Sequence, residues 1–243
     1  DILISPGKEV HDYQATPDDA KLLAQADVLV ENGLGIEEFL SDLVANAGNS
    51  KLQQIDASQG IEVIKEEHEE HGHEEEEQGH HHEEGNPHVW LDPVLAQQQV
   101  ANIRDGLIAI DPSNADSYRS NAEAYIQQLQ QLDSEFQQRL AAVKGCNFIT
   151  FHDAFPYLAQ RYGLQQEAIV EIPEDSITPQ DIQRVQQAAD QYLVKALFTE
   201  PGIEDKRIQQ ISSDLNLPLE VIDPLESGET DPQYYFQAMH KRF

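Results

Sequence analysis

The feature that most constrains the fold is a long stretch without helix breakers in the middle of the chain. From residue 113 to residue 143 there is no Pro or Gly, and Ala, Gln, Leu and Glu dominate. Apolar residues recur there at helical spacing: Tyr118, Ala122, Tyr125, Leu129, Leu132, Phe136 and Leu140. Roughly 30 residues of helix span about 45 Å, which is longer than an ordinary globular helix. The alternatives are half of a coiled-coil dimer and a strut between two domains; about three heptads favour the strut.

Short apolar segments alternate with helical patterns on both sides of this stretch. Strands are predicted at 1–5, 27–31, 52–57, 61–64, 148–151, 168–172, 196–199 and 219–222, and helices at 17–26, 36–47, 93–110, 155–162, 176–194, 206–215 and from 232 onward. Such alternation is typical of parallel α/β units. The sequence therefore predicts an α/β fold of two lobes, each a parallel-type sheet with flanking helices, joined by one long rigid helix. We expect an N-terminal lobe at 1–110, the linking helix at 111–144 and a C-terminal lobe at 145–243.

A second biased segment, residues 65–84, indicates contact with metal. It contains ten Glu and six of the ten His of the chain, at positions 68, 71, 73, 80, 81 and 82. Neutral imidazole and carboxylate are donors that borderline divalent metals accept, and His-rich tracts are typical of metal binding. The alternatives are a solvated acidic loop with incidental His and part of an expression tag. A tag is disfavoured because the run is internal and interleaved with Glu.

The net charge of the chain limits the classes of partner that it is expected to bind. Fifteen Lys and Arg stand against 45 Asp and Glu, which gives a formal net charge of −30 over 243 residues. This balance argues against nucleic acid and anionic membrane surfaces, which need a basic patch, and it suits attraction of cations. The single Cys, Cys146, permits no intrachain disulfide. No segment is apolar for long enough to cross a bilayer.

Four residues outside the run lie in loops or at the ends of predicted elements, and several follow strands, where parallel α/β units bind ligands. His11 lies in a strand-to-helix loop, His88 follows the turn at 85–87, His152 follows the strand at 148–151, and Asp223 ends the strand at 219–222. Two come from each half, so a site built from them would lie between the lobes. Their spacing matches no zinc finger, CxxC or HExxH motif. An ordinary surface or hydrogen-bonded role therefore stays open for each.

Four segments carry a family resemblance: GKEVHDYQATPDDAKLLAQADVLVENGLGIEEFL, NPHVWLDP, FITFHDAF and VIDPLE. In this order they resemble the solute-binding proteins of bacterial zinc and manganese ABC importers, most closely the zinc-specific, ZnuA-type branch. The resemblance covers essentially the whole chain, and the branch's His- and acid-rich loop falls where residues 65–84 lie. It implies two α/β lobes joined by one long helix, with the metal between them. The family's first strand and helix are missing and the last helix stops early at Phe243, so we expect a trimmed or partial chain.

Carried over residue by residue, the resemblance makes His11, His88 and His152 metal ligands. Asp223 falls on a position that supplies a carboxylate ligand in some members only. Manganese-type relatives have Glu at the place of His152, and three imidazoles suit Zn(II) better than the harder manganese. Some zinc members have an acidic ligand directly before the first His, where this chain has Val10. The fourth ligand stays open between Asp223, a water and a donor from the run.

Other side chains next to these positions are candidates to support the site. Asp12, Asp153 and Glu200 could each accept a hydrogen bond from a ligating imidazole and fix its tautomer. Surface charge, helix capping and loop bonding are the alternatives for them. We expect Trp90 to pack beneath the site rather than touch metal, and His240, on the last helix, to be a surface residue.

The resemblance implies an extracytoplasmic binding protein and not an enzyme. It would capture Zn(II) in an interlobe cleft and deliver it to the permease subunit of an ABC importer for high-affinity zinc uptake. We expect a monomer that binds no nucleic acid and is periplasmic or otherwise extracytoplasmic, with a membrane anchor left open. The alternatives are a manganese-type member of the family, an adhesin-like surface protein of the same family, and a zinc hydrolase, because three His plus an open position also describe catalytic zinc.

Overall fold

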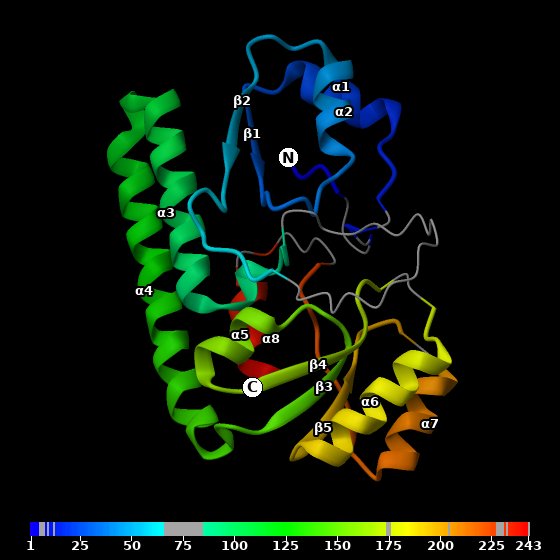
Figure 1. Ribbon diagram of the computed structural model, residues 1–243. Helices are drawn as coiled ribbons and strands as arrows, with labels where there is room; N and C mark the ends of the chain where they lie inside the picture. Colours follow the sequence, from blue (N-terminus) through cyan, green and yellow to red (C-terminus); the bar gives the residue numbers. More distant parts are fainter. Residues whose placement is uncertain are drawn as a thin grey trace.

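Two parallel sheets lie toward opposite ends of the molecule, and a pair of long helices runs past both (Figure 1). The computed structural model describes residues 1–4, 8, 10–11, 13–65, 85–173, 176–203, 205–226, 231 and 233–242. The smaller sheet pairs β1 with β2, and the larger has the strand order β4-β3-β5-β6. Every pairing is parallel. The predicted α/β fold with flanking helices and one long helix is confirmed.

The N-terminal unit consists of α1 (Pro17–Gln25), β1 (Val28–Glu31), α2 (Leu40–Ala47) and β2 (Gln53–Asp56). The start of α1 is fixed by Thr16 as N-cap and Pro17 in the first turn. The Thr16 hydroxyl accepts from the Asp19 N–H, and the Asp19 carboxylate accepts from the Thr16 N–H at 2.7 Å. A small core of Leu23, Leu29 and their neighbours joins both helices to β1.

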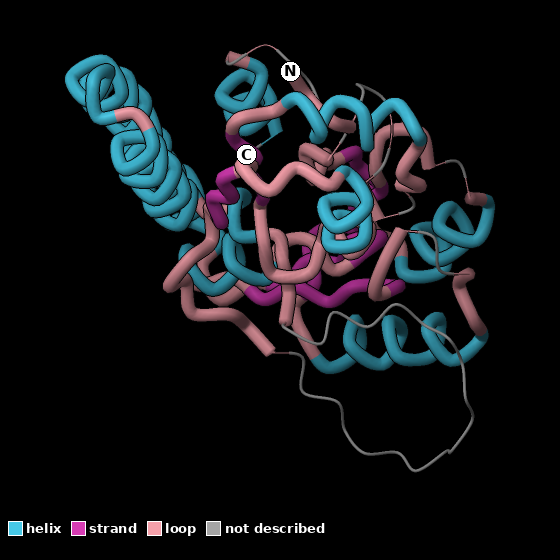
Figure 2. Tube along the Cα trace, turned by 90° about the horizontal axis from the view of Figure 1, so that it is seen from above, coloured by secondary structure: helices cyan, strands magenta, loops and turns pink. Residues whose placement is uncertain are grey.

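The helix pair begins just after the predicted site segment at His88. The 3-10 turn η1 (Val89–Leu91) leads to α3 (Pro93–Ile110), and η2 (Pro112–Asn114), α4 (Ala115–Leu140) and η3 (Ala141–Val143) follow. At 26 residues α4 is about 39 Å long. Viewed from above, the pair stands along one side of the molecule (Figure 2). The apolar face of α4 is covered within the chain, because Leu129, Leu132 and Phe136 are fully buried in one core with residues of α3 and α5.

The C-terminal unit builds the larger sheet and its cover. It contains β3 (Asn147–His152), α5 (Pro156–Tyr162), β4 (Gln165–Val170), α6 (Pro179–Gln191), β5 (Val194–Thr199), α7 (Lys206–Leu215), β6 (Leu219–Val221) and α8 (Tyr234–Arg242). Every residue of the central strand β3 is buried, as a parallel strand covered on both faces should be. Phe148 packs into the core shared with α4 and α5, whereas Ile149 and Phe151 pack toward α6 and α7.

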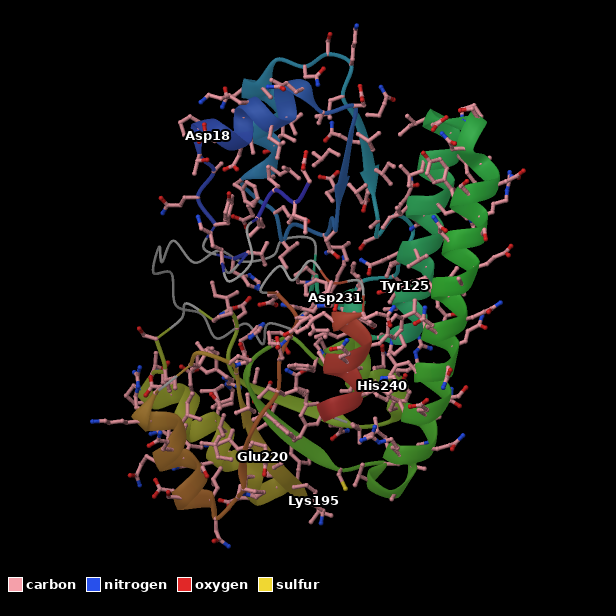
Figure 3. The ribbon with its side chains drawn as sticks, turned by 180° about the vertical axis from the view of Figure 1, so that it is seen from behind. Asp18, Tyr125, Lys195, Glu220, Asp231 and His240 are labelled. Carbon is pink, nitrogen blue, oxygen red and sulfur yellow. The ribbon has the colours of Figure 1, made fainter. Side chains whose placement is uncertain are left out.

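The last helix, α8, closes against α4. The Tyr125 and Phe236 rings lie with centroids 4.9 Å apart, and His240 Nε2 is 3.1 Å from Glu135 Oε2. Figure 3 shows Tyr125 and His240 along this contact, between Asp18 at one end of the molecule and Lys195 at the other. The His240 side chain is 44% exposed, so His240 is a surface residue, as expected.

Two predicted strands are wrong. Residues 1–4 and 61–64 form no strand. In the second segment Ile61 is buried against Val89 and Tyr157, and the Ile64 N–H donates to the Tyr157 hydroxyl at 3.1 Å. The Tyr157 hydroxyl thus accepts the backbone hydrogen bond of Ile64 that a neighbouring strand would otherwise accept. None of the described helices combines the length and apolarity of a membrane span.

Candidate metal centre

Four side chains from distant parts of the chain converge between the two sheets: His11, His88, His152 and Glu226. One donor atom from each lies within 4.8 Å of the donors of the other three. The His88 and Glu226 side chains are 1% exposed, that of His152 is 0% exposed, and that of His11 is 3% exposed. Three imidazoles and one carboxylate buried together are a donor set for a borderline divalent metal.

The spacing of the donors fits one ion in their midst. Glu226 Oε1 is 2.8 Å from His88 Nε2, 3.4 Å from His152 Nε2 and 3.5 Å from His11 Nε2, and the Nε2 atoms of His88 and His152 are 3.3 Å apart. Four ligands at about 2.0–2.1 Å around a tetrahedral zinc stand roughly 3.3–3.4 Å from one another. The four measured separations, 2.8–3.5 Å, are therefore close to those of a tetrahedral zinc site.

His152 is held by the sheet itself. It is the last residue of β3, and Glu200 directly follows the neighbouring strand β5, so the parallel pairing brings both to the same sheet edge. Glu200 Oε1 accepts from the His152 N–H at 3.1 Å and lies 2.6 Å from its Nδ1. A carboxylate can only accept, so Nδ1 carries a proton, and Nε2 is the nitrogen whose lone pair the neutral ring can offer to a metal.

The other two imidazoles come from the N-terminal side. His88 follows the Asn86-Pro87 turn and directly precedes η1, and its ring centroid lies 5.1 Å from that of Trp90. Trp90 contributes no ligand atom to the group, because its Nε1–H group is engaged in a hydrogen bond to the Pro224 carbonyl at 2.8 Å. The His11 ring centroid lies 5.5 Å from that of His88 and 5.8 Å from that of His152.

Glu226 reaches the group through a tight turn after β6. Asp223 builds this turn: its Oδ1 accepts from the Leu225 N–H at 2.9 Å and its Oδ2 from the Tyr234 hydroxyl at 3.0 Å. Leu225 has φ of +64°, a conformation that a branched side chain adopts only where the surroundings enforce it. The turn redirects the chain so that Glu226, and not Asp223, presents its carboxylate to the three imidazoles.

The predicted residues therefore separate into two groups. His11, His88 and His152 lie together, whereas Asp223 lies outside the group of four and supports the turn. Glu226 was missed although its segment, VIDPLE, was part of the resemblance. The signal was the Asp-Pro pair, since an Asp before Pro favours a turn in which its carboxylate bonds the local backbone.

The electrostatics of the site follow from burial and close contact. Burial would raise the pKa of Glu226, but the close approach of the three imidazoles holds it well below its usual range. Burial lowers the pKa of His88 to about 4. Burial would also lower the pKa of His152, but Glu200 and then Glu226 raise it to about 10. Without a metal, the site thus pairs ionised Glu226 with a protonated His152 and a neutral His88.

The supporting candidates also have defined places. Glu200 bonds His152 as described. None of the described hydrogen bonds joins Asp153 to an imidazole Nδ1. Instead, the Oδ2 and the carbonyl oxygen of Asp153 accept hydrogen bonds from the Asn86 Nδ2, at 3.2 and 2.6 Å, respectively. Burial raises the pKa of the Asp153 carboxyl. Asp12 and the His of residues 66–84 lie outside the described residues.

Comparisons with known proteins agree on one kind of protein. A family model described as zinc-uptake complex component A, periplasmic, matches residues 1–243. The high-affinity zinc uptake system protein ZnuA of Bacillus subtilis is 34% identical over 234 residues, which are 96% of this chain and 73% of that protein. The zinc-binding lipoprotein AdcA of Streptococcus pneumoniae is 31% identical over 228 residues, which are 93% of this chain but 46% of the longer relative.

A solved structure extends the likeness to another metal. A manganese-bound variant of a periplasmic metal binding protein from Candidatus Liberibacter asiaticus is 25% identical, with a TM-score of 0.80. The alignment covers 99% of this chain and 87% of that chain. Both the sequence and the arrangement of elements are therefore similar to those of extracytoplasmic metal-binding proteins.

Proposed function

The chain belongs to the ZnuA family of periplasmic zinc-uptake components, and from this premise we propose that it captures Zn(II) between its two sheets and delivers it to the permease subunit of an ABC importer. Members of the family are solute-binding proteins and not enzymes. The observation that carries the proposal is the convergence of three imidazoles and the Glu226 carboxylate, whose donor atoms all lie within 4.8 Å of one another. In the proposed zinc site, the ligands are His11, His88, His152 and Glu226, and Asp223 is not a ligand.

The donor set favours zinc over manganese. Zinc takes four nitrogen, sulfur or oxygen ligands in a tetrahedron, whereas manganese suits sites richer in oxygen and of higher coordination number. Three of the four donors here are nitrogen. The close spacing of all four, with 2.8–3.5 Å between the measured pairs, leaves little space for added waters.

The charges also support a bound divalent cation. Glu226 contributes one negative charge directly and Glu200 a second one through His152. With three neutral imidazoles, a divalent ion makes the buried assembly neutral, which avoids the cost of an uncompensated buried charge. Four protein donors also leave no open tetrahedral position for a reacting water, in contrast to catalytic zinc.

Competitive titration of Zn(II) against Mn(II) tests the metal. The parent chain should bind one zinc tightly and prefer it to manganese, and His152→Glu, which exchanges a nitrogen donor for oxygen, should shift the preference toward manganese. Identical metal preference in both proteins would mean that His152 is no ligand. Delivery is tested separately: the zinc-loaded chain should stimulate ATP hydrolysis by the importer reconstituted in vesicles, and the apo chain should stimulate it less.

A further inference from the structure

His88 receives its orientation from an amide rather than from a carboxylate. Asn86 Oδ1 accepts from the His88 backbone N–H at 3.1 Å and lies 2.9 Å from its Nδ1. Both residues are buried, Asn86 at 2% and His88 at 1% exposure. The arrangement is analogous to that of Glu200 and His152, in which one oxygen atom also faces both the backbone N–H and Nδ1.

The partners of Asn86 fix which end of its amide faces the imidazole. Its other end contacts the Asp153 carbonyl at 2.6 Å and the Asp153 carboxylate at 3.2 Å, and both of these groups accept. That end must therefore be the NH2 group, and the end facing His88 must be the oxygen. Since amide oxygen only accepts, Nδ1 of the neutral His88 ring carries the proton, and Nε2 is the nitrogen available to a metal.

The backbone of Asn86 is bonded as fully as its side chain. Its N–H donates to the Ile64 carbonyl at 3.0 Å, and its carbonyl accepts from the Tyr157 hydroxyl at 2.6 Å. Tyr157 belongs to α5 and Asp153 directly follows β3, so both belong to the C-terminal unit. The residue that orients His88 is thus held by three hydrogen bonds to Asp153 and Tyr157 of the C-terminal unit.

We propose that Asn86 is the positioning residue of His88, and that its bonds to Asp153 and Tyr157 fix the orientation of this ligand. The inference rests on the proposed function, since it gives Asn86 a role in zinc affinity. Loss of these bonds releases the His88 ring from its tautomer and weakens the hold on zinc.

The test compares Asn86→Ala and the volume-keeping Asn86→Leu with Asn102→Ala in the full chain. Asn102 is a matched control: its Nδ2 also donates to two carbonyls, of Ala57 at 2.8 Å and Gln59 at 2.9 Å, but it orients no imidazole. Zinc affinity is measured by competition with a chelator. The ring state of His88 is read from long-range proton–nitrogen correlation spectra, which a merely structural role would not change.

We expect the Asn86 variants to lose about 10- to 100-fold in zinc affinity, as loss of an outer partner of a ligating His does, and to show a mixture of Nε2- and Nδ1-bound His88. Asn102→Ala should keep the parental affinity and ring state even where its melting temperature falls. Affinity and ring state at parental values in an Asn86 variant would overturn the inference, and so would an equal affinity loss in the control.

A milder variant keeps the inference falsifiable where the Asn86 variants do not fold. Asp153→Ala removes one of the two acceptors that hold the Asn86 amide and should weaken zinc binding about two- to tenfold. Parental affinity together with a parental His88 ring state in Asp153→Ala would contradict the inference. Failure of the parent chain to bind zinc tightly would instead refute the proposed function itself.

Discussion

Glu200→Gln removes one buried negative charge beside a candidate ligand while it keeps the shape of the side chain. The Glu200 carboxylate is 5% exposed, and one oxygen serves both the backbone N–H and Nδ1 of His152. The oxygen of Gln can accept both bonds. The fold and the tautomer should therefore persist, and only the charge that makes the imidazole a better donor to the metal is lost.

The expected loss follows from this geometry. Outer partners of ligating His contribute about 10- to 100-fold to metal affinity, which is about 1.4–2.7 kcal/mol. Because Gln keeps both hydrogen bonds, we expect the lower end, about tenfold weaker zinc binding. Glu200→Ala also leaves the buried His152 N–H without its acceptor, so it should reach the upper end and lower the stability of the apo protein.

Competition with a chelator at fixed pH measures the zinc affinities of Glu200→Gln and Glu200→Ala. Glu220→Gln is the matched control, because it removes the same charge from an exposed position on β6 (Figure 3). Long-range attraction of cations by this acidic chain should change equally in the two variants. The reasoning is refuted if Glu200→Gln binds zinc as tightly as Glu220→Gln does.

Three further predictions address the ligand set, the proton balance and the fold. Glu226→Gln should weaken zinc binding far more than Asp223→Asn in a titration, whereas the reverse order would restore Asp223 as the fourth ligand. Since the pKa of His152 is raised to about 10 without metal, zinc must displace a proton at neutral pH, and its affinity should rise with pH. Calorimetry in buffers of different ionisation enthalpy should give about one proton released per zinc at pH 7–8; a value near zero would contradict this. Leu132→Ala should destabilise the fold by about 2–5 kcal/mol in denaturant unfolding, and a loss below about 1 kcal/mol would show that the α4 face is not part of the core.

The sequence was most informative where local chemistry decides the structure. Thr16 and Thr178 each precede a Pro, and both cap a helix with the reciprocal bonds of a capping box. The stretch without Pro or Gly does form the long helix α4. At 61–64, by contrast, apolar composition alone could not say whether a strand partner existed, because the bonds come from Tyr157 and Asn86, far along the chain.

The site shows the same limit. The end of a predicted strand located His152. The choice between Asp223 and Glu226, however, depended on the turn at Leu225, where tertiary contacts enforce a strained backbone conformation. The roles of Glu200 and Asn86 depend on which strands and loops become neighbours. Parallel order β4-β3-β5-β6 brings Glu200 to His152, and no spacing along the sequence contains that information.

The most direct test of the account is zinc K-edge X-ray absorption of the chain loaded with one equivalent of zinc. The account predicts a four-coordinate ion with three imidazole nitrogens and one carboxylate oxygen at about 2.0–2.1 Å. The spectrum should be the same after replacement of the six His of the run by Asn: His68, His71, His73, His80, His81 and His82. A spectrum that loses its imidazole signal in that variant, or a six-coordinate oxygen-rich site, would contradict the four-residue centre.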